Sequence, residues 1–232
     1  MVVAPELARE PEAAVAVTTR PVLILVGPPG CGKGTQARIL ADRLGIPCIS
    51  TGEILRSECV CDTQLGRSIR EIMGDGGLVS DELVNVLVAQ RISAPDCQRG
   101  FILDGYPRSM VQAEDFQSTL TGLGDRARVI VFDIDPENLV GRLTSRRSCA
   151  VCGRVYNLLS CPPAKAEYCD DDGTRLVKRT DDEENVIRKR FAAYEASTAP
   201  LLSYYAAEGM IRVDAGADPQ SVARQIEASL RD

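Results

Sequence analysis

The stretch that decides the fold runs from residue 22 to residue 35 and reads Val22-Leu-Ile-Leu-Val26 followed by Gly27-Pro-Pro-Gly-Cys-Gly-Lys-Gly-Thr35. A continuous apolar run of this length is typical of a strand that is buried on both faces of a parallel sheet. From Thr35 to Leu44 the apolar residues recur at helical spacing, and Gly45 ends the pattern. The stretch therefore predicts a strand, a glycine-rich loop and a helix in direct succession.

This loop carries the groups that hold a phosphate chain. Its glycines allow successive backbone N–H groups to turn inward and form an anion site, and the start of the helix adds partial positive charge. Lys33 adds a full charge that can reach the outer phosphates of a nucleotide. The generic motif has Ser or Thr directly after the lysine, whereas here Gly34 stands in that place and Thr35 follows.

Strands and helices alternate through the rest of the chain. Apolar runs predict further strands at residues 46–50, 101–104, 128–134 and 210–213. Amphipathic stretches predict helices at residues 81–92, 113–120, 136–147, 181–207 (bent near Pro200) and 219–230. This order predicts an α/β fold with a five-stranded parallel sheet and helices on both faces.

Composition excludes several classes of protein. The chain has 232 residues and a net charge of −6. This negative charge argues against binding to nucleic acid or to an anionic membrane surface, because both attract basic proteins. No apolar run approaches the about 18 residues that a membrane helix needs. Histidine is absent, so neither histidine catalysis nor a histidine metal ligand is available. Residues 1–20 lack a secretion signal, and we expect a disordered tail on a cytoplasmic protein.

The segment Ser148–Thr180 interrupts the alternation and holds four of the nine cysteines. Cys149 and Cys152 precede a glycine, and so do Cys169 and Asp172, which is the spacing of two metal-binding turns. Three thiolates and a carboxylate favour a closed, structural Zn²⁺ site. Cys161 is the rival fourth ligand, and reduced cysteines that pack a small lobe without metal are the alternative.

Several motifs in order resemble the nucleoside monophosphate kinases, and adenylate kinases with a long, zinc-bearing lid most closely. The resemblance covers Pro21 to the C-terminus and rests on Gly27–Gln36, Ser50-Thr-Gly-Glu-Ile-Leu-Arg56, Leu78-Val-Ser-Asp81 and Phe101-Ile-Leu-Asp-Gly-Tyr-Pro-Arg108. It implies a fold like that of the P-loop nucleoside triphosphate hydrolases. It also implies a core at 21–50, 80–147 and 181–232, a monophosphate-binding lobe at 51–79 and a lid at 148–180.

The resemblance also assigns roles to individual residues. It places ATP against Gly30, Cys31, Gly32, Lys33, Gly34, Thr35, Arg142 and Arg146. It places AMP against Thr51, Gly52, Arg56, Val79, Gly105, Arg108, Gln112, Arg179 and Arg190. The catalytic set would be Lys33, Asp104, Arg108, Arg142, Arg146, Arg179 and Arg190. Fixed guanidiniums suit this task because arginine is always charged and binds phosphate bidentately, although charged helix faces are often merely solvated.

Three of these residues bear on the metal and the base. Asp104 ends a strand at the ligand edge of the sheet, where it would hold water bound to Mg²⁺ or simply cap the strand. In the resembled family, Thr at position 51 accompanies adenine in the acceptor site, and the alternative is that Thr51 only caps the following helix. The amide of Gln112 could pair with two edges of adenine at once.

The implied reaction is reversible, Mg²⁺-dependent transfer from ATP to AMP, giving two ADP without a phosphoenzyme, by a protein expected to be a monomer. The nearest alternatives are a GTP:AMP kinase and a UMP/CMP kinase; pyrimidine kinases usually have a short lid, which disfavours the second. A different class would be a zinc-ribbon module that binds nucleic acid. The acidic run Asp170-Asp-Asp172 and the scarcity of aromatic residues in the insertion argue against that class.

Overall fold

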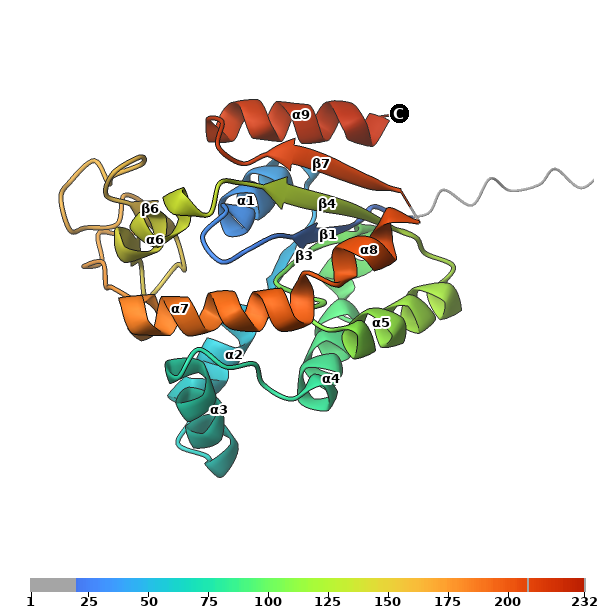
Figure 1. The fold of residues 1–232 in the computed structure, drawn as a ribbon, viewed down its shortest axis with the longest axis horizontal. Coiled ribbons are helices and arrows are strands. Elements are labelled where there is room, and N and C mark those ends of the chain that lie inside the picture. Colours follow the sequence, from blue (N-terminus) through green and yellow to red (C-terminus); the bar gives the residue numbers. More distant parts are fainter. Residues whose placement is uncertain (1–19, 208, 232) are drawn as a thin grey trace, which may run out of the picture.

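The computed structural model describes residues 20–207 and 209–231. A five-stranded parallel sheet forms its centre, in the order β2-β3-β1-β4-β7 (Figure 1). The strands are β1 Val22–Val26, β2 Cys48–Ser50, β3 Phe101–Asp104, β4 Ala127–Asp133 and β7 Met210–Asp214. This sheet confirms the predicted fold class, and β1 lies at its centre with all five residues buried.

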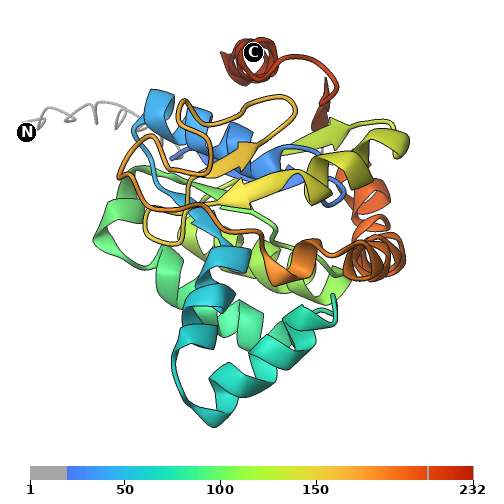
Figure 2. The ribbon, with the colours of Figure 1, turned by 90° about the vertical axis from the view of Figure 1, so that its left-hand side faces the viewer.

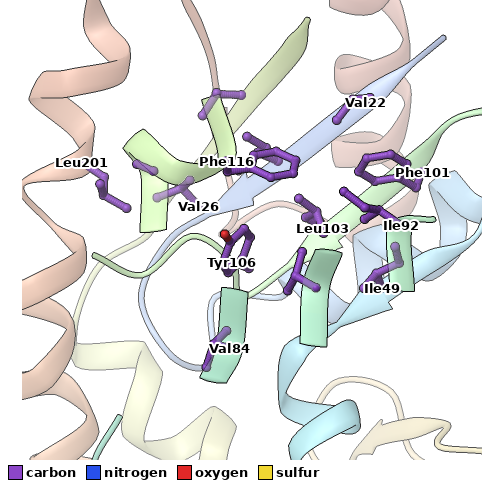
Figure 3. Close-up of a cluster of buried hydrophobic side chains, with 14 of the residues drawn as sticks. Val22, Val26, Ile49, Val84, Ile92, Phe101, Leu103, Tyr106, Phe116 and Leu201 are labelled. Carbon is purple, nitrogen blue, oxygen red and sulfur yellow. The ribbon is translucent and has the colours of Figure 1, made fainter. Parts of the chain in front are cut away.

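Helices cover both faces of the sheet. The α-helices are α1 Lys33–Leu44, α2 Thr51–Val60, α3 Gln64–Gly74, α4 Asp81–Ile92, α5 Met110–Leu123, α6 Glu137–Thr144, α7 Glu184–Ala193, α8 Leu201–Ala206 and α9 Pro219–Arg231. Alternate residues of β1 face opposite ways, as the two-residue period of a strand requires. Leu23 and Leu25 pack with α1, α6 and α9, while Val22, Ile24 and Val26 pack with α4, α5 and α8. Figure 3 shows the second cluster around Tyr106 and Phe116.

Two insertions leave the core. Helices α2 and α3 form a hairpin that protrudes from one end of the molecule (Figure 2), although apolar periodicity alone assigned no helix to this segment. β5 Arg146–Ser148 leads into the second insertion and pairs antiparallel with β6 Val155–Asn157 inside it, and turns follow up to residue 179. We call this second insertion, residues 148–180, the lid.

The predicted helix at 136–147 is too long. Helix α6 ends at Thr144, and Arg146 and Arg147 belong to β5. Continuing the helix would require the Arg146 N–H to bond the Arg142 carbonyl. Asn157 of the lid donates to that carbonyl instead, at 3.0 Å. A contact from a distant segment therefore ends this helix.

The single helix predicted at 181–207 begins later, at Glu184, and is interrupted before Pro200. Residues Thr180–Asp182 form a 3₁₀ turn, α7 follows, and Tyr194–Thr198 form a π-helical turn before α8. The wider turn brings the Thr198 hydroxyl to the Arg108 carbonyl, to which it donates at 2.9 Å. Tertiary contacts thus override the uniform helical pattern.

The predicted tail at 1–20 lies outside the described residues except for Arg20. The guanidinium of Arg20 pairs with Asp125 at 2.7 Å and donates to the Cys97 carbonyl at 2.8 Å. This residue is therefore part of the folded domain. Within residues 20–207 and 209–231, no helix is both long and apolar enough to cross a membrane.

Candidate active site

The loop between β1 and α1 adopts a conformation that only glycine accommodates readily. Gly30 and Gly32 have φ angles of 84° and 106°, and Gly32 is the N-cap residue of α1. A Cβ atom at Gly30 would also lie 2.9 Å from the Leu143 side chain of α6. The loop is thus pre-shaped at the helix N-terminus, where backbone N–H groups and the helix dipole favour an anion.

Lys33 closes this loop. Its ammonium donates to the carbonyls of Gly27 at 2.7 Å and Pro28 at 2.9 Å, and lies 3.5 Å from Cys31 Sγ. Cys31 is 2% exposed and packs inside the loop. The lysine is therefore held at the predicted phosphate position by neutral groups, which leaves its positive charge without a counter-ion among these three contacts.

Gly34, which follows Lys33, lies close to an acidic side chain. Position 34 lies in the first turn of α1, beside the end of β3, and a Cβ atom there would come 3.2 Å from Asp104 Oδ2. Gly34 thus allows the Asp104 carboxylate to approach the first turn of α1. A side chain at this position would require the Asp104 carboxylate to move by a few tenths of an ångström.

Arginines from separate segments converge beside the loop and are held by two aspartates. Arg146 makes a bidentate pair with Asp182, with Nε to Oδ2 at 2.7 Å, and Asp182 is fully buried. Arg190 of α7 bonds Asp181 at 3.0 Å and Asp182 at 3.1 Å. Arg179 donates to the Ser148 hydroxyl at 2.8 Å. Such pairing fixes the guanidiniums as a rigid set instead of a solvated surface.

The charge of this cluster is not balanced. Burial, together with the nearby guanidiniums of Arg56 and Arg146, lowers the pKa of Arg179 to about 10, although Asp181 and Asp182 act in the opposite direction. Burial also lowers the pKa values of Arg56, Arg108 and Arg190, and nearby guanidiniums lower them further. Burial alone would raise the pKa of Asp181, yet the surrounding arginines hold it below its usual value. The site therefore favours additional negative charge.

The turn after β3 organises the opposite side of the site. The Gly105 carbonyl accepts from Thr51 Oγ1 at 2.8 Å and from Arg108 Nε at 2.7 Å. Ser50 is the N-cap residue of α2, so the alternative in which Thr51 caps that helix is wrong. A Cβ atom at Gly52 would lie 3.2 Å from the Arg56 guanidinium. Thr51, Gly52, Arg56, Gly105 and Arg108 of the predicted AMP set thus form one wall, while Val79 is buried in the core cluster.

Gln112 is 3% exposed and is engaged within the protein. Its Oε1 accepts from the Arg108 backbone N–H at 2.7 Å, and its Nε2 donates to Asp81 Oδ1 at 2.7 Å. Ser109 donates to the other oxygen of Asp81 at 2.8 Å. The sequence placed Asp81 only at a hinge, and no spacing pattern indicated that it orients Gln112. One hydrogen and one lone pair of this amide remain for a ligand.

Arg142 lies on α6, the helix that packs against the phosphate loop. Its guanidinium donates to the Ala215 carbonyl, in the turn after β7, at 3.0 Å. Most of the predicted ATP residues thus lie on the loop, α1 and α6, with Arg146 on β5. Most of the predicted AMP residues lie on α2, the β3 turn and α5, with Val79 before α4, Arg179 at the end of the lid and Arg190 on α7. Arg146, Arg179 and Arg190 lie in the cluster near Arg56, next to Asp181 and Asp182.

Both insertions lie over this cluster. Gly153 of the lid lies so near α1 and α2 that a Cβ atom there would come 3.4 Å from Glu53 Oε1 and 3.9 Å from an Arg38 nitrogen. At the other insertion, Asp75 pairs with Lys189 of α7 at 2.6 Å. In this structure the lid thus approaches α1 and α2, and the 51–79 lobe is joined to α7.

The lid brings the four predicted metal ligands together. The ligand atoms of Cys149, Cys152, Cys169 and Asp172 all lie within 4.8 Å of one another. Cys149 Sγ is 3.2 Å from Asp172 Oδ2, and Cys152 Sγ is 3.5 Å from Cys169 Sγ, close to the spacing of about 3.8 Å that tetrahedral Zn–S bonds of about 2.3 Å require. Cys161 is not part of this group. The donor set fits zinc.

Comparison with known proteins agrees with this geometry. The adenylate kinase family model matches residues 25–210. An adenylate kinase of Geobacter sp. (strain M21) is 46% identical over 211 residues, covering 90% of this chain and 99% of the relative. That of Thermotoga maritima is 48% identical over 195 residues, covering 83% and 89%. That of Anaeromyxobacter sp. (strain Fw109-5) is 46% identical over 191 residues, covering 82% and 89%.

Nearly the whole length of each relative aligns with this chain. The residues that match the family model include the glycine-rich loop, the arginine cluster and the lid. The shared region is therefore the whole catalytic domain and not one common motif. The chain belongs to the adenylate kinase family, whose members are nucleoside monophosphate kinases.

Proposed function

We propose that this chain transfers the terminal phosphoryl group of ATP to AMP, giving two ADP, and that the reverse reaction uses the same site. The observation that carries this proposal is the arginine cluster, whose buried charge exceeds that of Asp181 and Asp182. Two nucleotides that meet phosphate to phosphate supply the missing negative charge. Arg56 and Arg108 lie within electrostatic range of Asp104, whose carboxylate is next to Gly34 at the end of the phosphate loop.

ATP would bind on the loop side. The backbone of Gly30, Cys31, Gly32 and Gly34, with Thr35 and the Lys33 ammonium, would hold its phosphates. Arg142 and Arg146 would contact the donor nucleotide and the group in transfer. Lys33 already turns its charge toward the loop carbonyls, so phosphate oxygens would replace weaker, neutral partners.

AMP would bind on the opposite wall. Arg56 and Arg108 would hold its phosphate, joined by Arg179 and Arg190 when the lobes close. Thr51, Gly52, Val79, Gly105 and Gln112 would line the rest of this subsite. Asp81 and the Arg108 backbone fix the amide of Gln112 in one orientation, and a fixed amide can select adenine by its donor and acceptor pattern.

The chain needs no general base and no nucleophilic side chain for this reaction. The acceptor is a phosphate oxygen that is already ionised at neutral pH, so the protein must position the two groups and neutralise charge. Closure of the 51–79 lobe and the lid would exclude water and so prevent simple hydrolysis of ATP.

We propose two metal ions with different tasks. Magnesium bound with ATP would neutralise phosphate charge, and Asp104 and Thr35 are the oxygen groups placed to hold it or its water. Zinc in the lid would be structural, because Cys149, Cys152, Cys169 and Asp172 complete a tetrahedral set and leave no open position for chemistry. Two observations support these assignments. The Asp104 carboxylate lies beside position 34, next to Lys33 of the phosphate loop, and the four lid ligands lie within 4.8 Å of one another.

We propose further that the protein acts as a monomer in the cytoplasm. One chain supplies both proposed nucleotide subsites, so the reaction requires no partner subunit. A site of three zinc thiolates is suited to a reducing compartment, in which cysteines stay unpaired, and the cysteines of the described residues are all free.

AMP should be the preferred acceptor. With Mg²⁺-ATP as donor, we expect kcat/KM for AMP to exceed that for UMP and CMP, because Thr51 and the oriented Gln112 amide match adenine. A coupled ADP assay with each monophosphate measures this, and repeating it with GTP as donor tests the GTP:AMP alternative. A higher kcat/KM for UMP or CMP would show that the acceptor assignment is wrong.

A further inference from the structure

A tyrosine hydroxyl is built into the candidate metal site. Tyr156 of β6 is 2% exposed, and it packs with Cys149, Cys169 and Leu176 in the buried cluster of the lid. Its hydroxyl lies 3.4 Å from Cys169 Sγ and 2.7 Å from the backbone nitrogen of Asp170. The ring therefore fills the lid, while its polar end meets one of the proposed zinc ligands.

The two neighbours of this hydroxyl determine where its hydrogen points. The Asp170 N–H can only donate, so the tyrosine oxygen accepts that bond. The hydroxyl hydrogen is then directed at Cys169 Sγ, which accepts it. Tyr156 thus joins β6, the strand that follows the Cys149–Cys152 turn, to the separate turn that carries Cys169 and Asp172.

A hydrogen bond to Cys169 Sγ would stabilise the negative charge of the ligand set. Three thiolates and a carboxylate carry four negative charges, and one Zn²⁺ neutralises only two of them. Neighbouring N–H groups stabilise two other ligands: Val151 N donates to Cys149 Sγ at 3.4 Å, and Thr174 N donates to Asp172 Oδ1 at 2.9 Å. At Cys169 the backbone N–H groups of Asp171 and Asp172 also hydrogen-bond the sulfur, and the Tyr156 hydroxyl is the side-chain donor.

Arg154 holds the tyrosine in this position. Its guanidinium lies over the Tyr156 ring, 5.1 Å from the centroid, and it pairs with Asp171 next to the ligand Asp172. The arginine therefore restrains the ring and also adds positive charge beside an anionic site. The hydroxyl is thereby pre-positioned for the sulfur.

We propose that Tyr156 is a positioning residue for the lid metal: its hydroxyl donates to the Cys169 thiolate, fixes the orientation of that ligand and slows the release of zinc. This inference rests on the proposed zinc site. Groups that hydrogen-bond a metal ligand are typically worth 10- to 100-fold in metal affinity. We expect an effect of about 10-fold for a single neutral donor.

The test compares the wild-type chain with Tyr156→Phe and with Tyr168→Phe. Phenylalanine keeps the buried ring and removes only the hydroxyl. Tyr168 is a matched control, because it also lies in the lid, beside Cys169, but is 37% exposed with its ring under Lys165. Zinc per chain is measured by elemental analysis, and zinc release is followed with a chromophoric chelator.

We expect one zinc in each protein, release about 10-fold faster from Tyr156→Phe, and a wild-type rate for Tyr168→Phe. In the Co²⁺-substituted proteins, loss of a hydrogen bond to sulfur should move the thiolate-to-cobalt charge-transfer band of Tyr156→Phe to longer wavelength. A lid that is merely loosened, for example by the unpaired Asp170 N–H, would release metal faster without that shift.

The outcomes separate this inference from the zinc site itself. Full zinc occupancy with equal release rates and unshifted cobalt bands in all three proteins would overturn the role of Tyr156 and leave the zinc site intact. Faster release without a band shift would also overturn it. Zinc near zero in the reduced wild-type protein would overturn both.

Discussion

Replacing Lys33 with Met is expected to lower kcat by about 10²- to 10³-fold, which is the effect of removing one preorganised charge-stabilising group from an active site. The lysine ammonium lies in the phosphate loop against the carbonyls of Gly27 and Pro28. Methionine has a similar length but no charge. The phosphoryl group would therefore no longer be stabilised by a positive charge during its transfer. Steady-state rates with saturating ATP and AMP measure the change.

Lys165→Met is the matched control, because that lysine is exposed on the lid and stacks on Tyr168. We expect this variant to keep wild-type turnover. Both variants should unfold near the wild-type temperature, since Lys33 is only half-buried and its loop is shaped by glycines. Turnover close to wild type in Lys33→Met would contradict the role given to the phosphate loop.

Removing the proposed lid metal should produce the largest loss of stability. Loss of a structural metal is among the changes that cost about 4 kcal/mol or more, and in a chain of this length each kcal/mol lowers Tm by about 2–4 °C. We therefore expect Cys149→Ser, or chelation of the wild-type protein, to lower Tm by roughly 8–16 °C. The lid should unfold first, because it buries only a small cluster around Cys149, Tyr156, Cys169 and Leu176.

Cys161→Ser serves as the control, since Cys161 is exposed in the same lid and lies outside the ligand group. It should retain zinc and Tm, whereas Asp172→Cys should bind zinc at least as well as the wild type because thiolate suits the site. Calorimetry and elemental analysis decide between these cases. Zinc retained in Asp172→Ala but lost in Cys161→Ser would assign the fourth position to Cys161.

Features that depend on neighbouring residues along the chain were predictable from the sequence. The run Val22–Val26 identified the central strand, and the glycines after it identified the phosphate loop, because both signals are local. The spacing of Cys149, Cys152, Cys169 and Asp172 also indicated the group that the structure assembles. In each case one short segment contains the physical cause.

Features that arise from contacts between distant segments were not predictable. Helix α6 ends early because Asn157 caps the Arg142 carbonyl, and α7 is followed by a π turn that brings Thr198 to Arg108. The role of Asp81 in orienting Gln112 likewise depends on α4 and α5 lying side by side. No pattern within one helix records such a partner.

Nucleotide balance tests phosphoryl transfer between ATP and AMP most directly. Purified protein is mixed with ATP, AMP and Mg²⁺, and all nucleotides and inorganic phosphate are quantified by chromatography as the reaction proceeds. We predict two ADP formed for each AMP consumed, no inorganic phosphate, and the formation of ATP and AMP when ADP is the only nucleotide supplied. Release of inorganic phosphate from ATP with AMP unchanged would contradict the assignment.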